Sequence, residues 1–411
     1  MLGVNKKNRI DLLTILVFLI VARLSCPGLS NIPFMSVGFI FIYGVLFCGL
    51  YLFSAKRLTQ SELKILMVVL CYTVFVLVKI ILSGGGIFST DAFNAYIIFF
   101  MVVIYFWLKE QTDSLRANLL KLIFAGCIFN YAYSIIVLYF DPSASRISAA
   151  SEVSPYDILS AIGGFDAVYG GIFVVLILLY MRNNIEKGGN RILINLVLIL
   201  ALIFIFMASY ATAIIMLLLS VFIFISNKNK ALSFIGIFAI VAMVFFHQAV
   251  GAFIMEMSKR ITYSETISNK INEFGYMVKT LEAAGTYAGD EGRLKNMLDS
   301  LNTFLKYPIF GGLGEEGAII GEHSEFCDVL GKYGLIAFSV ITMFFVFLHK
   351  EIRKNITIKE NVKCLNIVYF IFIILTVLNP ALYTLIQLPI ILMIFLSESY
   401  VRETANRTPK K

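Results

Sequence analysis

The chain has 411 residues, of which 59% are hydrophobic and only 15% are charged, and its mean hydropathy is +0.86. Soluble globular domains contain about 45–50% apolar and about 25% charged residues. This composition therefore excludes an ordinary soluble enzyme, a disordered chain and a nucleic-acid-binding domain. The net charge of +8 is typical of a membrane protein whose cytoplasmic loops are rich in Lys and Arg. The chain is predicted to be an all-α polytopic protein surrounded by membrane lipid, with no nucleic-acid partner.

The apolar runs predict about twelve membrane-spanning helices in a single membrane domain of residues 1–411. Each such helix needs roughly 20 mostly apolar residues. The predicted spans lie at about 10–26, 32–53, 63–82, 92–108, 119–140, 162–181, 192–208, 210–226, 231–250, 326–348, 364–379 and 381–398.

The distribution of positive charge predicts the orientation of these spans. Lys and Arg gather at the N-terminus, in every second loop and in the C-terminal tail, whereas the other short loops hold only Arg23 and Arg146. Because short cytoplasmic loops collect positive charge, both termini are predicted to be cytoplasmic.

One long loop, at about residues 251–325 between the ninth and tenth spans, is predicted to be extracytoplasmic and to contain amphipathic helices. Its clearest helix is expected at 293–306, where leucines and a methionine recur on one face at helical spacing. Pro308 and the glycines Gly311, Gly312 and Gly314 should end it. The loop is the one extracytoplasmic segment with enough polar residues to carry chemistry.

Three histidines occur, and only His323 lies where the long loop re-enters the membrane, beside acidic residues. A histidine at such a boundary can act as a general base near neutral pH, although an interfacial polar residue would look the same. His247 and His349 are interpreted as structural or solvated. Asp328 and Lys332 are spaced four residues apart, so a helical ion pair is the simplest explanation of both.

The sequence from residue 289 to about 340 contains an ordered set of short motifs. They are a Gly-Arg helix start at Arg293, an amphipathic helix, Tyr-Pro-Ile-Phe-Gly-Gly-Leu-Gly to Gly314, His323-Ser, and Gly-Lys-Tyr-Gly-Leu to Leu335. This order, together with the span count and the position of the long loop, resembles the O-antigen polymerase and O-antigen ligase superfamily of bacterial membrane glycosyltransferases.

The resemblance implies a glycosyltransferase type C-like fold that acts without a metal or other cofactor at the periplasmic face of the bacterial inner membrane. It implies a polyprenyl-diphosphate-linked oligosaccharide as the donor, and it adds a chain-length regulator protein to the expected partners. His323 matches the family histidine thought to activate the acceptor hydroxyl. Arg293 matches an arginine that binds the diphosphate, a task that suits the bidentate, permanently charged guanidinium.

The chain departs from the family pattern at the end of the seventh span. Many relatives carry Ser-Arg there, whereas this chain has Ser209-Tyr210. The missing diphosphate contact is therefore expected from Tyr210, from Arg146, or from the pair Lys259 and Arg260. Glu291 is expected either to form an ion pair with Arg293 or to orient it.

Three functions follow from these patterns. The main prediction is an O-antigen polymerase, an inverting enzyme that moves a growing glycan from polyprenyl diphosphate to a new lipid-linked repeat unit. The alternative is the ligase, which moves the finished polymer to lipid A–core and shares the same motifs. A flippase or transporter of lipid-linked sugars is disfavoured because few charged residues lie within the spans.

Overall fold

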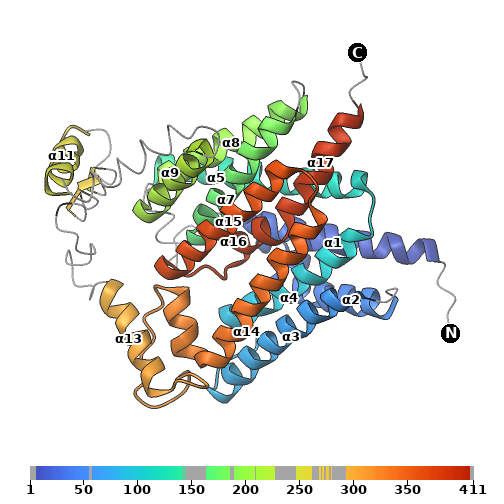
Figure 1. The fold of residues 1–411 in the computed structure, drawn as a ribbon, viewed down its shortest axis with the longest axis horizontal. Coiled ribbons are helices and arrows are strands. Elements are labelled where there is room, and N and C mark those ends of the chain that lie inside the picture. Colours follow the sequence, from blue (N-terminus) through green and yellow to red (C-terminus); the bar gives the residue numbers. More distant parts are fainter. Residues whose placement is uncertain are drawn as a thin grey trace.

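The structure is a computed structural model that describes residues 6–54, 58–141, 144, 163–185, 189–208, 210–226, 247–261, 268–269, 271–272, 275–276, 279 and 293–407. In this part of the chain every secondary-structure element is a helix, and most helices pack into one bundle (Figure 1). Nine of the described helices are long and apolar enough to cross a membrane. The prediction of an all-α, multi-pass membrane protein is confirmed in this form.

Two short 3-10 helices, η1 (Pro27–Asn31) and η2 (Pro33–Met35), lie between the first two α-helices. The other described helices follow in chain order. They are α1 (Lys6–Ser25), α2 (Val37–Ser54), α3 (Gln60–Leu82), α4 (Thr90–Lys109), α5 (Asp113–Phe140), α7 (Phe165–Asn184), α8 (Gly189–Ala208), α9 (Ala211–Ser226), α11 (His247–Lys259), α13 (Arg293–Lys306), α14 (Glu325–Asn355), α15 (Lys359–Leu378), α16 (Thr384–Leu388), the π-helical turn η4 (Pro389–Met393) and α17 (Ile394–Arg407).

Each predicted span except the ninth coincides with a described helix. Two of them, Leu12–Ser25 and Thr212–Ser226, are apolar but shorter than the other spans. The ninth, at about 231–250, lies outside the described residues apart from its last four, which belong to α11. In the long loop, α13 begins and ends at the predicted residues, so that prediction is confirmed.

Hydroxyl side chains fix where several of these helices begin. Thr59 and Glu62 form a reciprocal capping box at the start of α3, and Ser89 and Thr112 accept hydrogen bonds from the first turns of α4 and α5. Such caps satisfy backbone N–H groups that have no partner inside the helix.

The last span, formed by α16, η4 and α17, lies at the centre of the bundle, where residues 385–401 are all buried.

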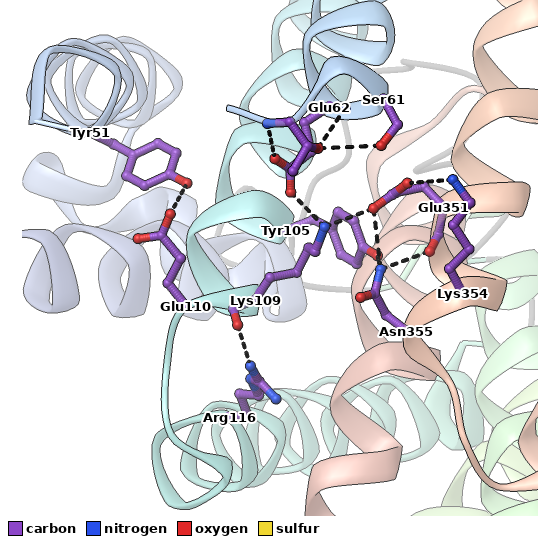
Figure 2. Close-up of polar contacts among 11 residues, drawn as sticks. Tyr51, Ser61, Glu62, Tyr105, Lys109, Glu110, Arg116, Glu351, Lys354 and Asn355 are labelled. Carbon is purple, nitrogen blue, oxygen red and sulfur yellow. Dashed lines mark hydrogen bonds and ion pairs between the residues drawn. The ribbon is translucent and has the colours of Figure 1, made fainter. Parts of the chain in front are cut away.

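A half-buried ammonium group joins three helices at one end of the bundle. Lys109, the last residue of α4, contacts the carboxylates of Glu62 in α3 at 2.5 Å and Glu351 in α14 at 2.7 Å (Figure 2). Asn355 donates a hydrogen bond to Glu351 at 3.3 Å and another to the Tyr105 hydroxyl at 3.1 Å. This is the end predicted to face the cytoplasm.

At the other end, residues 308–314 lie against a break in α14. Gly334 has φ 74° and ψ −173°, which interrupts the helix. The Gly312 N–H donates to the Gly331 carbonyl at 2.7 Å, and the Leu335 N–H donates to the Pro308 carbonyl at 2.8 Å. Inside a membrane a helix break is tolerated only where protein satisfies the freed backbone groups. The Gly-Gly-Leu-Gly and Gly-Lys-Tyr-Gly motifs thus contact each other through their backbones.

The substitution Gly334→Ala should destabilise the protein. A Cβ at this position would overlap the Ile309 carbonyl oxygen, and the backbone conformation alone costs a non-glycine residue on the order of 1–3 kcal/mol. The midpoint of thermal unfolding of the detergent-purified protein should fall. Gly49→Ala is the matched control, because a Cβ at Gly49 meets no atom within 4 Å. Equal midpoints for the two variants would contradict this role of Gly334.

Candidate functional site

His323 lies in a short loop, residues 321–324, that leads directly into α14. Ser324 caps this helix, because its hydroxyl accepts a hydrogen bond from the Cys327 N–H at 3.3 Å. The His323 side chain is exposed, and it forms no hydrogen bond or ion pair with the residues that the structure describes. Its imidazole is therefore open to a substrate.

One carboxylate holds the loop on both sides of His323. Asp328 accepts hydrogen bonds from the Glu322 N–H at 3.2 Å and from the Ser324 N–H at 3.0 Å. The Ser300 hydroxyl of α13 also donates to Asp328, at 2.6 Å, and accepts from the Gly321 N–H at 2.9 Å. Asp328 is only 6% exposed. The loop is thus fastened to α13 and α14 at the same point.

The predicted ion pair between Asp328 and Lys332 is wrong. Lys332 lies instead 2.9 Å from Asp91 in α4 and 3.1 Å from Glu322. The Tyr333 hydroxyl donates to the same Asp91 oxygen at 2.9 Å. The four-residue spacing suggested a local partner, whereas α4 brings one from 241 positions away in the sequence.

These residues line a polar cavity of about 440 Å³ between α3, α4, the start of α14 and the segment after α15. Its charged side chains are four carboxylates and one ammonium group, namely Asp91, Glu322, Glu325, Asp328 and Lys332. Thr90, Asn94 and Tyr383 add further groups that can form hydrogen bonds. Because Asp91 lies at one end of α4 and Lys109 at the other, about 30 Å apart, the cavity and the Lys109 cluster lie at opposite ends of the bundle.

Glu325 connects the cavity to the loop between α15 and α16. One of its carboxylate oxygens accepts hydrogen bonds from the Ala381 N–H at 2.9 Å and the Leu382 N–H at 3.0 Å. Its own N–H donates to the Asn379 carbonyl at 3.2 Å. The turn at Asn379-Pro380, between α15 and α16, is therefore held against the start of α14.

An aromatic cluster links the cavity to the start of α9. The ring of Phe165 lies 6.0 Å from that of Tyr383, which lines the cavity, and 6.0 Å from that of Tyr210. Burial raises the pKa of Tyr383 to about 12, and the nearby Glu325 and Asp91 carboxylates act in the same direction. Its phenol therefore stays protonated and able to donate a hydrogen bond. Tyr210 thus lies two ring contacts away from the cavity.

An apolar groove of about 570 Å³ runs between α14 and α15. Glu325, Val329 and Leu382 line both this groove and the polar cavity, so the two meet at the start of α14. The groove extends along α14 as far as His349 and Lys350. A ligand with a polar head and a long hydrocarbon chain would match this pair of spaces.

The predicted site residues lie in different parts of the molecule, and of Arg293 only the backbone is described. The first turn of α13, which begins at Arg293, meets the His323 loop, because a Cβ on Gly321 would overlap the Asn296 carbonyl oxygen. Lys259 and Arg260 are exposed at the end of α11, which lies apart from α13 and α14 (Figure 1). Arg146 and Glu291 lie outside the described residues.

Among the described residues, no group of three or more His, Cys, Asp or Glu side chains is placed to hold a metal ion. A scan against protein-family models and a search of curated proteins gave no match for this chain.

Sequence reasoning missed Asp91 and Tyr333 as members of the site and assigned Asp328 and Lys332 to a local pair. The sequence does contain one indication of the site. A charged residue inside an apolar helix is costly, so it implies a charged partner or a water-filled cavity. Lys332 in α14 carries that signal, but the sequence does not say which of the distant carboxylates it meets.

Replacing Lys332 by Met should destabilise the protein, because Asp91 and Glu322 would lose their shared cation. A buried polar group left without a partner costs on the order of 1–3 kcal/mol, and a charged one costs more. Water offsets part of this cost here, because the Asp91 side chain is 37% exposed. Adding Asp91→Asn to Lys332→Met should restore part of the loss in the midpoint of thermal unfolding. The control is Lys354→Met, whose side chain is 66% exposed and 3.6 Å from Glu351, since exposed ion pairs contribute little. No difference between Lys332→Met and Lys354→Met would contradict the assigned pairing.

Proposed function

We propose that this protein is a surface-polysaccharide polymerase of the O-antigen type. It would transfer a growing glycan from polyprenyl diphosphate to a new lipid-linked repeat unit, without a metal and with inversion at the anomeric carbon. The observation that carries the proposal is the position of His323, on a fastened loop beside a polar cavity that meets an apolar groove between membrane helices. A lipid-linked sugar needs both kinds of space.

In this proposal His323 is the general base. Its exposed imidazole would take the proton of the acceptor hydroxyl as that oxygen attacks the anomeric carbon and the diphosphate leaves from the opposite face. Hydrogen-bonding groups such as Asn94 and Tyr383 suit the binding of sugar hydroxyls. The isoprenoid chain would occupy the groove between α14 and α15.

The leaving diphosphate requires cations, and Arg293 would bind it. The first turn of α13 meets the His323 loop, and the N-terminus of a helix favours anions. Lys259, Arg260, Arg146 and Tyr210 remain the candidates for a second contact, with Glu291 orienting Arg293.

The proposed location is the bacterial inner membrane, with the His323 end of the bundle in the periplasm and both termini in the cytoplasm. This orientation is supported by the gathering of Lys and Arg in the loops at the Lys109 end. The growing chain and the new repeat unit are then both reached from the periplasmic face.

The test of this function is a gel of the lipopolysaccharide from a strain that lacks this protein. A polymerase predicts a single-repeat band in place of the ladder, because one repeat unit still reaches the cell surface. Loss of all polymer with accumulation of lipid-linked chains would instead indicate a ligase. An unchanged ladder would contradict both functions.

The role of His323 gives a sharper prediction with purified protein. His323→Ala should lower the rate of polymer formation about 10²–10⁴-fold, the usual range for loss of a general base, while insertion and expression stay normal. The control is Asn183→Ala at the end of α7, since the exposed Asn183 side chain donates to the Leu179 carbonyl of its own helix and lines neither the cavity nor the groove. The measurement is the initial rate with lipid-linked repeat units. A wild-type rate for His323→Ala would show that this histidine is not the base.

A further inference from the structure

The two backbone N–H groups that flank His323 donate to the same carboxylate. Glu322 N–H reaches one oxygen of Asp328 and Ser324 N–H reaches the other, at 3.2 and 3.0 Å. The peptide unit between Gly321 and Glu322 and the one between His323 and Ser324 are therefore both fixed to one buried side chain. A histidine in a loop without such a contact would sample several positions.

We propose that Asp328 is the positioning residue of His323, holding the imidazole at the rim of the polar cavity so that it reaches the acceptor hydroxyl. This inference rests on the proposed role of His323 as the base. Asp328 itself need not touch the substrate, because its carboxylate is already engaged by the loop and by Ser300.

Ordinary helix capping accounts for the Ser324 contact alone, since a first-turn side chain that accepts from the N-cap N–H resembles a capping box. The Ser324 hydroxyl already caps α14 through the Cys327 N–H. The Glu322 N–H lies two residues before the N-cap residue, outside the helix. Helix capping satisfies only the N–H groups of the first turn, so it does not explain this hydrogen bond. Asp328 therefore orders the loop that carries His323 in addition to the start of the helix.

The backbone of the loop requires such a restraint. Glu322 has φ 56°, which places a non-glycine residue in the left-handed region immediately before His323. Such a conformation is unfavourable for a residue with a side chain and persists only where its surroundings enforce it. The Asp328 contact to the Glu322 N–H and the Lys332 contact to its carboxylate, at 3.1 Å, hold this residue from both ends.

An aspartate is suited to this task in a way that asparagine is not. A carboxylate presents two acceptor oxygens, whereas an amide presents one oxygen and one NH₂ donor. In Asp328→Asn one of the flanking N–H groups would face a donor, so the loop would lose one of its two anchors. A displacement of about 1 Å at a reacting group can lower a rate about 10²-fold.

The experiment is a double-mutant cycle with Asp328→Asn, His323→Ala and the combined variant, assayed with lipid-linked repeat units. Asp328→Asn should lower kcat about 10–100-fold with little change in KM, since both oxygens of this carboxylate are already engaged by the loop and by Ser300. In the His323→Ala background the same substitution should change the residual rate by less than about twofold, because a residue that acts through another has no effect once that one is removed. Asp113→Asn, at the opposite end of the bundle where Asp113 contacts Ser399, is the control.

Each outcome separates this inference from the proposed function. If Asp328→Asn lowers the residual rate equally in both backgrounds, its role is structural and the inference fails while the base remains. If His323→Ala keeps the wild-type rate, His323 is not the base, and the proposed function of this residue is contradicted independently of Asp328. Should Asp328→Asn not fold, Ser300→Ala removes one donor to Asp328 and the acceptor of the Gly321 N–H, and it leaves the two backbone contacts that Asp328 itself makes. It should give a smaller loss of kcat that likewise disappears in the His323→Ala background, and an unchanged kcat or an equal loss in both backgrounds would overturn the inference.

Discussion

The backbone contact between residues 308–314 and the break in α14 is the constraint on which the rest of the site depends. A helix that is interrupted inside a membrane leaves polar groups that lipid cannot satisfy, and here the chain itself satisfies them through Gly312 and Leu335. Lys79 of α3 adds a hydrogen bond to the Gly311 carbonyl at 3.2 Å. The first part of α14 is thereby fixed to the long loop and to α3, which brings its polar residues to the cavity.

Two ammonium groups then fix the same helices at their opposite ends. Lys109 bridges carboxylates of α3 and α14, and Lys332 of α14 bridges the Asp91 carboxylate of α4 and Glu322. Each lysine has two acidic partners from separate segments, which compensates for its removal from water. Because α4 and α14 are held at both ends, the His323 loop is carried by a rigid part of the molecule, as an active site requires.

The sequence predicted the elements of this fold better than their contacts. Apolar runs gave the spans because helix formation in lipid depends on local composition, and α13 followed from its own periodicity. The partners of Lys332 and Asp328 were not predictable, since Asp91 and Ser300 reach them only after α4, α13 and α14 have packed. The glycine motifs were recognisable as a pattern, but their close backbone approach became clear only from the structure.

The charge of the polar cavity divides the proposed reaction between two regions. Four of its five charged side chains are carboxylates, and the fifth, Lys332, already has two acidic partners. Such a lining suits sugar hydroxyls and disfavours a diphosphate, because like charges at short range repel. In the proposed reaction the diphosphate would therefore lie outside the cavity, near the first turn of α13 and Arg293. The loop of His323 joins these two regions, which is where a base must lie to reach the acceptor hydroxyl as it attacks the anomeric carbon.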